Sequence, residues 1–336
     1  MTVPIAPVGG SGDDVLVVDN LATHFFTRGG VVKAVDGVSF RVRAGEILGL
    51  VGESGSGKSI TGFSILGLID QPGRIVAGSV RFNGREITGL DEPSLRALRG
   101  NRIAMIFQDP MMTLNPVLRI DTQMVEAVQA HARVSRAEAL ERARLALEQV
   151  GIPAPERRLK AYPHELSGGM RQRVAIAIAF INKPDLIIAD EPTTALDVTI
   201  QAQILYEAQK LCRETGTAMI WITHDLAVVS SLADRIAVMY AGRIVEQGRA
   251  ADVIGAPLHP YTEGLIGSVP SHNKRGEPLV QIPGMTPSLL SLPKGCAFST
   301  RCRYADAACR VPPPVLSLAE GRDVRCIRPL TGGRAA

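Results

Sequence analysis

The amino-acid sequence predicts an α/β protein in which a mostly parallel sheet is covered by helices. A glycine-rich segment, residues 52–59, lies between the apolar stretches Glu46 to Val51 and Ile60 to Ile69, as a turn between a buried strand and a helix would. Short apolar runs alternate with helical stretches through the middle of the chain. Hydrophobic residues make up 46% and charged residues 21%, which is typical of a globular protein with a sizeable core.

The elements on either side of the glycine-rich segment differ in kind. Val15 to Val42 is β-rich around a Gly29-Gly30 turn, which predicts an antiparallel sheet ahead of the segment. Gly78 to Ile87 predicts a hairpin closed by a type I′ turn at Asn83-Gly84. The later elements are expected at helix 93–100, strand 102–108, helical stretch 121–150, a helix opened by residues 166–170, strand 185–190, helix 199–214, strand 218–223, a helix after 224, and a hairpin ending near 248.

Residues Gly52 to Ser59 (GESGSGKS) match G-x-x-x-x-G-K-[ST], the P-loop. Its backbone N–H groups can wrap a phosphate, and the following helix N-terminus adds positive potential. Lys58 is expected to reach the β- and γ-phosphates and Ser59 to coordinate Mg²⁺. A chance glycine/serine turn is the alternative, which the strand and helix on either side disfavour. The expected nucleotide contacts in this part of the chain are Phe25, Gly52, Ser54, Gly55, Ser56, Gly57, Lys58, Ser59 and Ile60.

Phe25 has two interpretations that stay open. An aromatic side chain shortly before the P-loop could stack on a nucleotide base, and an ordinary core phenylalanine fits the same pattern.

Two further segments carry chemistry that matches a P-loop. The apolar strand 186–191 (LIIADE) ends in two carboxylates, so Asp190 is expected to hold Mg²⁺ and Glu191 to polarise the attacking water. Leu166 to Met170 (LSGGM) places a capping serine and two glycines at a helix N-terminus, which makes a second anion site. Two phosphate sites in one chain indicate a nucleotide held between two copies of the domain.

Charge and hydropathy exclude several classes of protein. Lys and Arg total 37 against 33 Asp and Glu, and this net charge of +4 is too mild to indicate nucleic-acid binding. No apolar run approaches the roughly 18 residues that span a bilayer. Residues 1–12 have no basic segment and are expected to be a disordered tail rather than a secretion signal. We therefore expect a cytoplasmic chain whose membrane role, if it has one, requires partner subunits.

The order of these motifs resembles that of ABC-type ATPase domains, over residues from about 15 to 250. The resemblance depends on the P-loop, Gln108 after its strand, the segment 166–173 (LSGGMRQR), the strand ending in Asp-Glu, residues 195–197 (ALD) and His224. Met170 departs from the glutamine that is commoner at its position, beyond the residues expected to contact phosphate. The resemblance implies a P-loop NTPase with a RecA-like parallel sheet core, an antiparallel β subdomain and an α-helical subdomain.

The resemblance also implies a role for each matching residue. Gln108 would contact the nucleotide and Mg²⁺ and link them to the helical subdomain, His224 would contact the γ-phosphate, and Asp197 would lie at the dimer seam. Glu191, His224 and Gln108 form the expected catalytic set, and Ser59, Gln108 and Asp190 the expected Mg²⁺ ligands. The residues expected to contact the partner's nucleotide are Ser167, Gly168, Gly169, Arg171 and Gln172.

Segments 108–120 (QDPMMTLNPVLRI) and 259–270 (HPYTEGLIGSVP), with the tail that follows, are similar to the oligopeptide/dipeptide importer ATPases. This resemblance divides the chain into an ATPase domain at 13–254, a helical subdomain at about 93–165 and a C-terminal extension at 255–336. It implies a second, non-identical ATPase subunit, two membrane permeases, an extracytoplasmic substrate-binding protein and a peripheral position on the cytoplasmic face of the membrane. Peptides are the expected cargo, and nickel, glutathione or a sugar are alternatives within the subfamily.

The C-terminal extension contains four of the five cysteines, Cys296, Cys302, Cys309 and Cys326. Disulfides are disfavoured in a reducing cytoplasm, and four thiolates can bind Zn²⁺ or an iron–sulfur cluster. Similar tails in this subfamily are associated with a [4Fe–4S] cluster, which the resemblance favours. Zinc, disfavoured by the lack of C-x-x-C pairs, and inert thiols remain alternatives. Cys212 is expected to be a small core residue.

A competing interpretation is a soluble ABC-type ATPase that acts on DNA or ribosomes. The chain has one P-loop, no heptad pattern and no strong basic charge. These features favour a transport ATPase without a nucleic-acid partner. A P-loop kinase would not need the segment 166–170.

Overall fold

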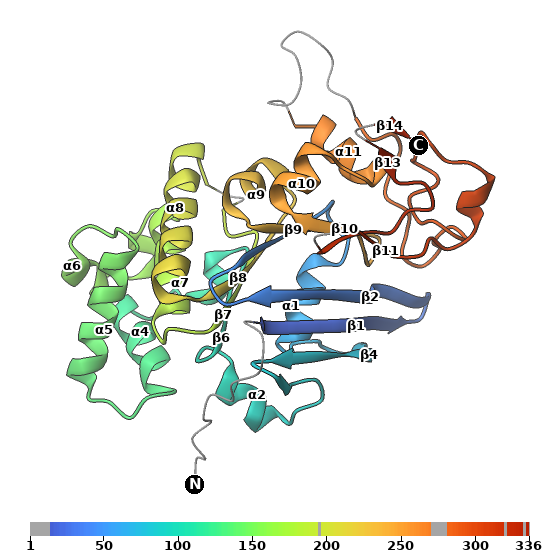
Figure 1. Ribbon diagram of the computed structural model, residues 1–336. Helices are drawn as coiled ribbons and strands as arrows, with labels where there is room; N and C mark the ends of the chain where they lie inside the picture. Colours follow the sequence, from blue (N-terminus) through green and yellow to red (C-terminus); the bar gives the residue numbers. More distant parts are fainter. Residues whose placement is uncertain (1–13, 194–195, 270–280, 319–320, 332–333, 336) are drawn as a thin grey trace. The chain divides into compact units, whose positions relative to one another are not determined.

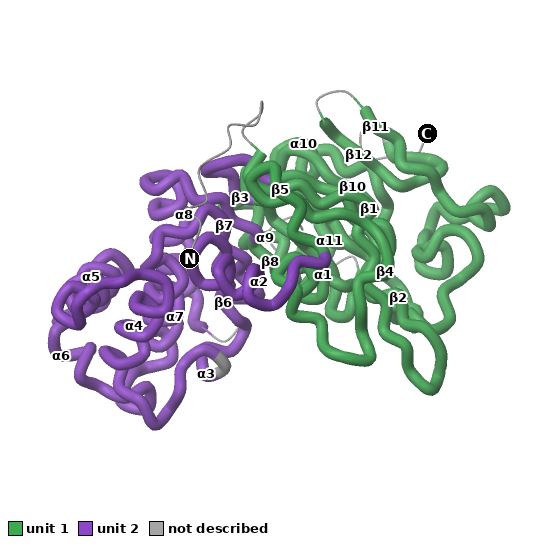
Figure 2. Tube along the Cα trace, turned by 90° about the horizontal axis from the view of Figure 1, so that it is seen from below, with its two compact units in different colours: residues 1–41, 48–88, 221–336 green, residues 42–47, 89–220 purple. Residues whose placement is uncertain are grey.

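The computed structural model describes residues 14–193, 196–269, 281–318, 321–331 and 334–335. It divides the chain into two compact units, drawn in different colours in Figure 2. Unit 1 comprises residues 1–41, 48–88 and 221–336, and unit 2 comprises residues 42–47 and 89–220. The tail expected at residues 1–12 lies outside the described residues.

The first sheet of unit 1 is the antiparallel sheet expected ahead of the P-loop. Its strand order is β2-β1-β4-β5, and both β1–β4 and β4–β5 are antiparallel pairs. The β4–β5 turn confirms the type I′ prediction, because Asn83 and Gly84 both have positive φ, 47° and 77°. The bounds are β1 Asp14–Thr27, β2 Gly30–Arg43, β4 Gly73–Phe82 and β5 Arg85–Glu86.

The second sheet of unit 1 surrounds the strand that precedes the P-loop. The strands run in the order β11-β12-β10-β9-β3, in which β3 is parallel to β9 and the pairs β9–β10, β10–β12 and β11–β12 are antiparallel. The C-terminal extension thus supplies β11 and β12 to the edge of this sheet, a role that its composition did not indicate. The bounds are β3 Ile47–Val51, β9 Arg235–Tyr240, β10 Arg243–Arg249, β11 Leu316–Leu318 and β12 Arg322–Val324.

The helices of unit 1 are short. All five residues of β3 are buried, and the strand leads through the glycine-rich turn into α1, as the apolar stretches predict (Figure 1). The remaining elements of this unit are α1 Lys58–Ile65, α9 Leu226–Leu232, α10 Ala250–Gly255, α11 Pro260–Gly267, the 3-10 helix Ala307–Arg310, and the strands β13 Leu330–Thr331 and β14 Arg334–Ala335.

Unit 2 contains most of the helices, together with the parallel strands β6 and β7. The helical stretch expected at 121–150 is two helices, α4 and α5, because the Ser135 hydroxyl accepts a hydrogen bond from Glu138 N at 3.1 Å and caps a new helix. The elements are α2 Glu92–Leu98, β6 Ile103–Ile106, α3 Pro110–Thr113, α4 Ile120–Gln129, α5 Arg136–Gln149, α6 Pro155–Leu159, the 3-10 helix Pro163–Glu165, α7 Gly168–Phe180, β7 Leu186–Asp190, α8 Val198–Thr215 and β8 Ala218–Thr223, whose last three residues belong to unit 1.

The cores of both units follow from the apolar faces of these elements. Alanine lines the buried face of α5, which lets α4 and α7 approach it closely, while its outer face carries ion pairs such as Arg142–Glu138. Cys212 is fully buried in α8, as expected of a small core residue. No helix in the described part of the chain is long and apolar enough to cross a membrane. The α/β class, with parallel strands, a separate antiparallel sheet and helices, is confirmed.

Candidate nucleotide site

The P-loop lies between β3 and α1 in unit 1. Gly57 caps α1 in the left-handed region (φ 104°), and an added Cβ would lie 2.2 Å from Ala34 O. Gly52 is similarly enclosed, with 2.1 Å to Met239 O, whereas nothing lies within 4 Å of a Cβ built on Gly55. Two glycines therefore permit close packing of the loop against its surroundings, and the third leaves its outer side open.

The loop positions its lysine through its own carbonyl groups. Lys58 Nζ donates to Gly52 O at 2.8 Å and to Glu53 O at 3.0 Å. Ser56 is buried, and among the described residues its hydroxyl has no hydrogen-bond partner. Ser54 and Gly55 are exposed, while Ser59 and Ile60 are half-buried at the start of α1.

Phe25 and His224 also belong to unit 1. Phe25 lies on β1 opposite Gly73 of β4, and its half-buried ring occupies the space that a Cβ on Gly73 would need. Its stacking on a base therefore stays a prediction. His224 is exposed in the turn between β8 and α9, where Asp225 Oδ1 accepts from Ala227 N at 2.8 Å.

Unit 2 brings together two of the expected catalytic residues. Gln108 follows β6 and Glu191 follows β7, and these parallel strands pair with Ile106 opposite Ala189. Gln108 Nε2 donates to Glu191 Oε2 at 3.3 Å. Asp190 ends β7 and is buried, whereas Glu191 has φ 45°, a left-handed conformation that is uncommon outside glycine. Such a turn at the carboxyl end of a buried strand aims two adjacent carboxylates in different directions.

The segment expected to contact a partner's nucleotide forms the N-terminus of α7. The Ser167 hydroxyl accepts from Met170 N at 3.3 Å, and nothing lies within 4 Å of a Cβ built on Gly168. Asp197 Oδ1 accepts from Ile200 N at 3.0 Å and caps α8. One open pocket of about 700 Å³ is lined by Ser167, Gly168, Gly169 and Asp197 together.

Arg171 and Gln172 do not line this pocket. Arg171 donates to Leu166 O at 3.1 Å, which holds the chain that leads into α7. Gln172 is 2% exposed, and its Nε2 has no acceptor among the described residues. Of the five residues expected to contact the partner's nucleotide, three therefore line a common cavity and two do not.

The four cysteines of the C-terminal extension line one small pocket of about 20 Å³ with His259 and Phe298. They are free thiols and are half-buried, and Cys296 N donates to Cys309 O at 3.0 Å. Burial raises the pKa of Cys296, Cys302 and Cys326, the last to about 11. In the described parts of the chain, however, no three His, Cys, Asp or Glu side chains are arranged to hold a metal ion. The expected iron–sulfur cluster thus has a suitable donor set but lacks a formed ligand arrangement.

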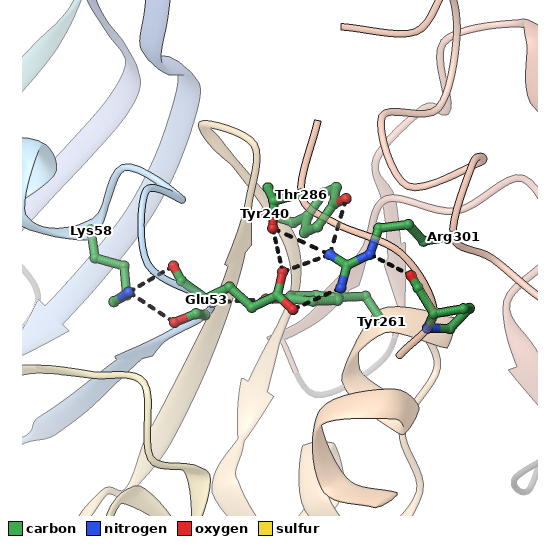
Figure 3. A network of polar contacts seen from close by, with 8 residues as sticks. Glu53, Lys58, Tyr240, Tyr261, Thr286 and Arg301 are labelled. Atoms are coloured by element: carbon green, nitrogen blue, oxygen red, sulfur yellow. Dashed lines mark hydrogen bonds and ion pairs between the residues drawn. The ribbon is translucent and has the colours of Figure 1, made fainter. Parts of the chain in front are cut away.

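The sequence reasoning missed the residues that hold the P-loop from outside. Glu53 Oε2 accepts from Arg301 Nη1 at 2.6 Å, and Glu53 N donates to the Tyr261 hydroxyl at 2.9 Å (Figure 3). Arg301 and Tyr261 both belong to the C-terminal extension. The acidic residue inside the P-loop was the one available signal, and nothing in the sequence pointed to its partner more than 200 residues away.

Comparison with protein families gives two matches along the chain. The family described as ABC transporter matches residues 35–194, and the family described as Oligopeptide/dipeptide transporter, C-terminal region, matches residues 245–309.

Curated relatives match over nearly the whole length. The chain is 50% identical over 329 residues to the Oligopeptide transport ATP-binding protein OppD of Escherichia coli (strain K12), covering 98% of this chain and 97% of that protein. It is 47% identical over 317 residues to the Dipeptide transport ATP-binding protein DppD of the same strain, covering 94% and 97%.

Among solved structures, the chain resembles the dimeric, post-hydrolysis state of the ATP-binding cassette MJ0796 bound to ADP and Pi. The TM-score is 0.64 at 29% identity, over 70% of this chain and 98% of that one. CbiO1 of Clostridium perfringens, part of the ABC transporter complex CbiONQ, gives a TM-score of 0.61 at 28% identity, over 72% and 90%.

Proposed function

Because this chain belongs to the family of oligopeptide and dipeptide ABC transporter ATPases, we propose that it binds and hydrolyses ATP to drive peptide import through a membrane transporter. The observation that carries this proposal is that one chain contains both a P-loop, in unit 1, and a pocket that joins Ser167, Gly168 and Asp197, in unit 2. One chain would thus supply both halves of a composite ATP site, each used with a partner subunit.

Each half has a distinct task in the proposed mechanism. The P-loop N–H groups and Lys58 bind the phosphates of ATP, and Phe25 is assigned to the base. Mg²⁺, held by Ser59, Asp190 and Gln108, would neutralise the charge that develops on the phosphate oxygens. Glu191 polarises the attacking water, and Gln108 holds its carboxylate.

The remaining groups complete the site across the dimer. His224 contacts the γ-phosphate, Ser167, Gly168 and Gly169 contact the partner's nucleotide, and Asp197 lies at the seam between subunits. Catalysis then consists of positioning and charge stabilisation, without a covalent intermediate.

The proposal includes the assembly and its place in the cell. Family membership implies a dimer of ATPase subunits and membrane permeases. We add that the second ATPase is a non-identical chain, that an extracytoplasmic binding protein delivers the peptide, and that the ATPase lies on the cytoplasmic face of the membrane. The domain boundaries 13–254 and 255–336 belong to the same proposal.

The test is transport in reconstituted vesicles. The chain, its partner ATPase and two permeases are reconstituted in proteoliposomes with the ATPases and ATP in the lumen and the binding protein outside. Uptake of a labelled alanine tripeptide into the vesicles is then measured. Uptake should require ATP and cease with Glu191→Gln. Uptake of nickel, glutathione or a sugar in place of the tripeptide would overturn the peptide assignment. Copurifying nucleic acid with no permease association would overturn the transport assignment.

We also propose that Cys296, Cys302, Cys309 and Cys326 hold a [4Fe–4S] cluster. Support comes from the four thiols that line a single pocket. A bound cluster would tie together the loops of the extension and add a redox-active group. Protein purified without oxygen should be brown and contain about four irons per chain. Cys302→Ser should lose the colour, whereas Cys212→Ala should keep it, and colourless protein with stoichiometric zinc would contradict the assignment.

A further inference from the structure

Every polar group of Glu53, the second residue of the P-loop, is engaged. Its N–H donates to the Tyr261 hydroxyl at 2.9 Å, and its carbonyl accepts from Lys58 Nζ at 3.0 Å. Its carboxylate accepts from Arg301 Nη1 at 2.6 Å and Nη2 at 2.9 Å, and from the Thr286 hydroxyl at 2.7 Å. The carboxylate thus binds the extension through both of its oxygens, while the backbone carbonyl of the same residue binds Lys58, the lysine of the P-loop (Figure 3).

Arg301 is itself held rigidly. It is 6% exposed, its Nε donates to Pro283 O at 2.9 Å, and its Nη1 lies 3.5 Å from the Tyr240 hydroxyl. A planar guanidinium that forms two parallel bonds to a carboxylate restricts the orientation of both groups. Because the charge is buried, removal of the carboxylate would leave it uncompensated, so the pair resists separation.

An aromatic cluster supports the pair on the side of the extension. The centroid of the Phe298 ring lies 5.3 Å from that of Tyr240 and 5.4 Å from that of Tyr261. The centroids of the Tyr240 and Tyr261 rings are 4.6 Å apart. Phe298 and Tyr261 belong to the extension, whereas Tyr240 ends β9, the strand that pairs with β3 just ahead of the P-loop. The partner of Glu53 is therefore part of a packed cluster rather than a loose surface loop.

We propose that Arg301 is a positioning residue for the P-loop, through which the C-terminal extension sets the affinity of the chain for ATP. The inference depends on the proposed ATP site. Arg301 holds the Glu53 side chain, and the Tyr261 hydroxyl accepts from the Glu53 N–H. These two contacts fix the Glu53 peptide, so its carbonyl stays in position to accept the hydrogen bond from Lys58 Nζ. When Arg301 is lost, the Glu53 peptide can rotate and Lys58 leaves the position from which it reaches the phosphates.

The test compares Mg-ATP binding by full-length variants, with Lys58→Ala as the reference for loss of the P-loop lysine. Arg301→Gln should raise the Kd for Mg-ATP about tenfold, or about 1.4 kcal/mol, and Arg301→Lys should recover part of that loss. Glu53→Gln should behave like Arg301→Gln, and the double variant should be no weaker than either single one, because both remove the same interaction.

Arg303→Gln is the matched control. Arg303 is two residues away in the same extension, and its guanidinium pairs with the carboxylate of Glu263 at 2.7 Å instead of with the P-loop. The Kd of the Arg303→Gln variant for Mg-ATP should stay within about twofold of the Kd of the parent protein. If Arg301→Gln does not fold, Tyr261→Phe removes only the hydroxyl that receives the Glu53 N–H and should also weaken ATP binding.

The proposal fails if Arg301→Gln and Glu53→Gln bind Mg-ATP as the parent does while Lys58→Ala does not. It also fails if the losses of ATP affinity caused by Arg301→Gln and Glu53→Gln add in the double variant, or if Arg303→Gln loses as much affinity as Arg301→Gln. If Lys58→Ala itself binds Mg-ATP normally, the proposed ATP site is wrong, and the inference that depends on it falls as well. At ATP concentrations below saturation, hydrolysis by Arg301→Gln should fall at least about tenfold, because Lys58 no longer holds its position at the phosphates, whereas Arg303→Gln should hydrolyse ATP as the parent does.

Discussion

Gln108 Nε2 lies 3.3 Å from Glu191 Oε2 and donates to it across the ends of two paired parallel strands. The bond holds a carboxylate whose backbone is in the left-handed region, at φ 45°. A residue in this conformation is held by its surroundings, and such residues occur often at functional sites. Glu191 is thus fixed in orientation by its strand on one side and by Gln108 on the other.

Replacement of Glu191 by Gln should leave ATP binding intact and reduce hydrolysis by at least about a hundredfold, because the amide cannot accept a proton from water. Binding of labelled ATP and release of phosphate measure the two effects separately. Glu138→Gln, on the exposed face of α5, is the control and should hydrolyse ATP normally. Retained hydrolysis in Glu191→Gln would mean that another group activates the water.

Substitution by alanine should destabilise the fold to different extents at the two P-loop glycines Gly57 and Gly55. Gly57→Ala places a Cβ 2.2 Å from Ala34 O at φ 104°, so we expect a loss of about 2–4 kcal/mol in the free energy of unfolding. Gly55→Ala meets no atom within 4 Å and should lose only about 1–2 kcal/mol from its positive φ, while its new methyl group occupies the open side of the loop and weakens ATP binding. Urea unfolding and ATP binding distinguish the two effects. Equal stability of both variants would contradict this division.

Asp197 should have a structural contribution that can be separated from its place at the proposed dimer seam. Asp197→Ala removes the cap of α8 and should cost about 1 kcal/mol in the free energy of unfolding, whereas Asp197→Asn keeps an acceptor for Ile200 N and should cost little. Thermal unfolding measures this difference. If the charge of Asp197 acts at the seam, hydrolysis should fall in both variants; if only the cap matters, Asn should restore it.

The stability contributed by Glu53 should depend on pH. The hydrogen bond from Arg301, opposed by burial, holds the pKa of Glu53 below its ordinary value of 4.5. A carboxyl with a lower pKa in the folded chain stabilises the fold fully above about pH 4.5, and this contribution is lost as the pH falls through the folded-state value.

We therefore expect Glu53→Gln to be less stable than the parent by about 1–2 kcal/mol at pH 7, with a difference that shrinks below pH 4.5. Urea unfolding across pH 3 to 7 measures it. The surface variant Glu138→Gln should change stability by less than about 0.5 kcal/mol throughout. A constant difference for Glu53→Gln at all pH values would show that the charge of Glu53 is not involved.

Local patterns predicted most elements of the fold. Strand 218–223 is found at its expected bounds, and the Asn83-Gly84 turn follows from two residues that accept positive φ. The split of the helical stretch at Ser135 could have been read from its capping pattern, since serine with glutamate three residues later starts a helix. Local patterns could not predict the contribution of the extension to a sheet, because the paired residues of β10 and β12, such as Glu246 and Val324, lie 76 to 78 positions apart in the chain.

The P-loop, the strand ending in Asp190 and Glu191, and the capped helix at Ser167 could all be predicted from the sequence, because each is a contiguous motif whose chemistry depends on neighbouring residues. Only the folded chain shows that Ser167 shares a cavity with Asp197, that Gln108 reaches Glu191, and that Arg301 binds Glu53. Such contacts join residues far apart in the chain, and their geometry depends on the packing of whole elements. A local motif can specify which atoms are available, but only the fold specifies which of them meet.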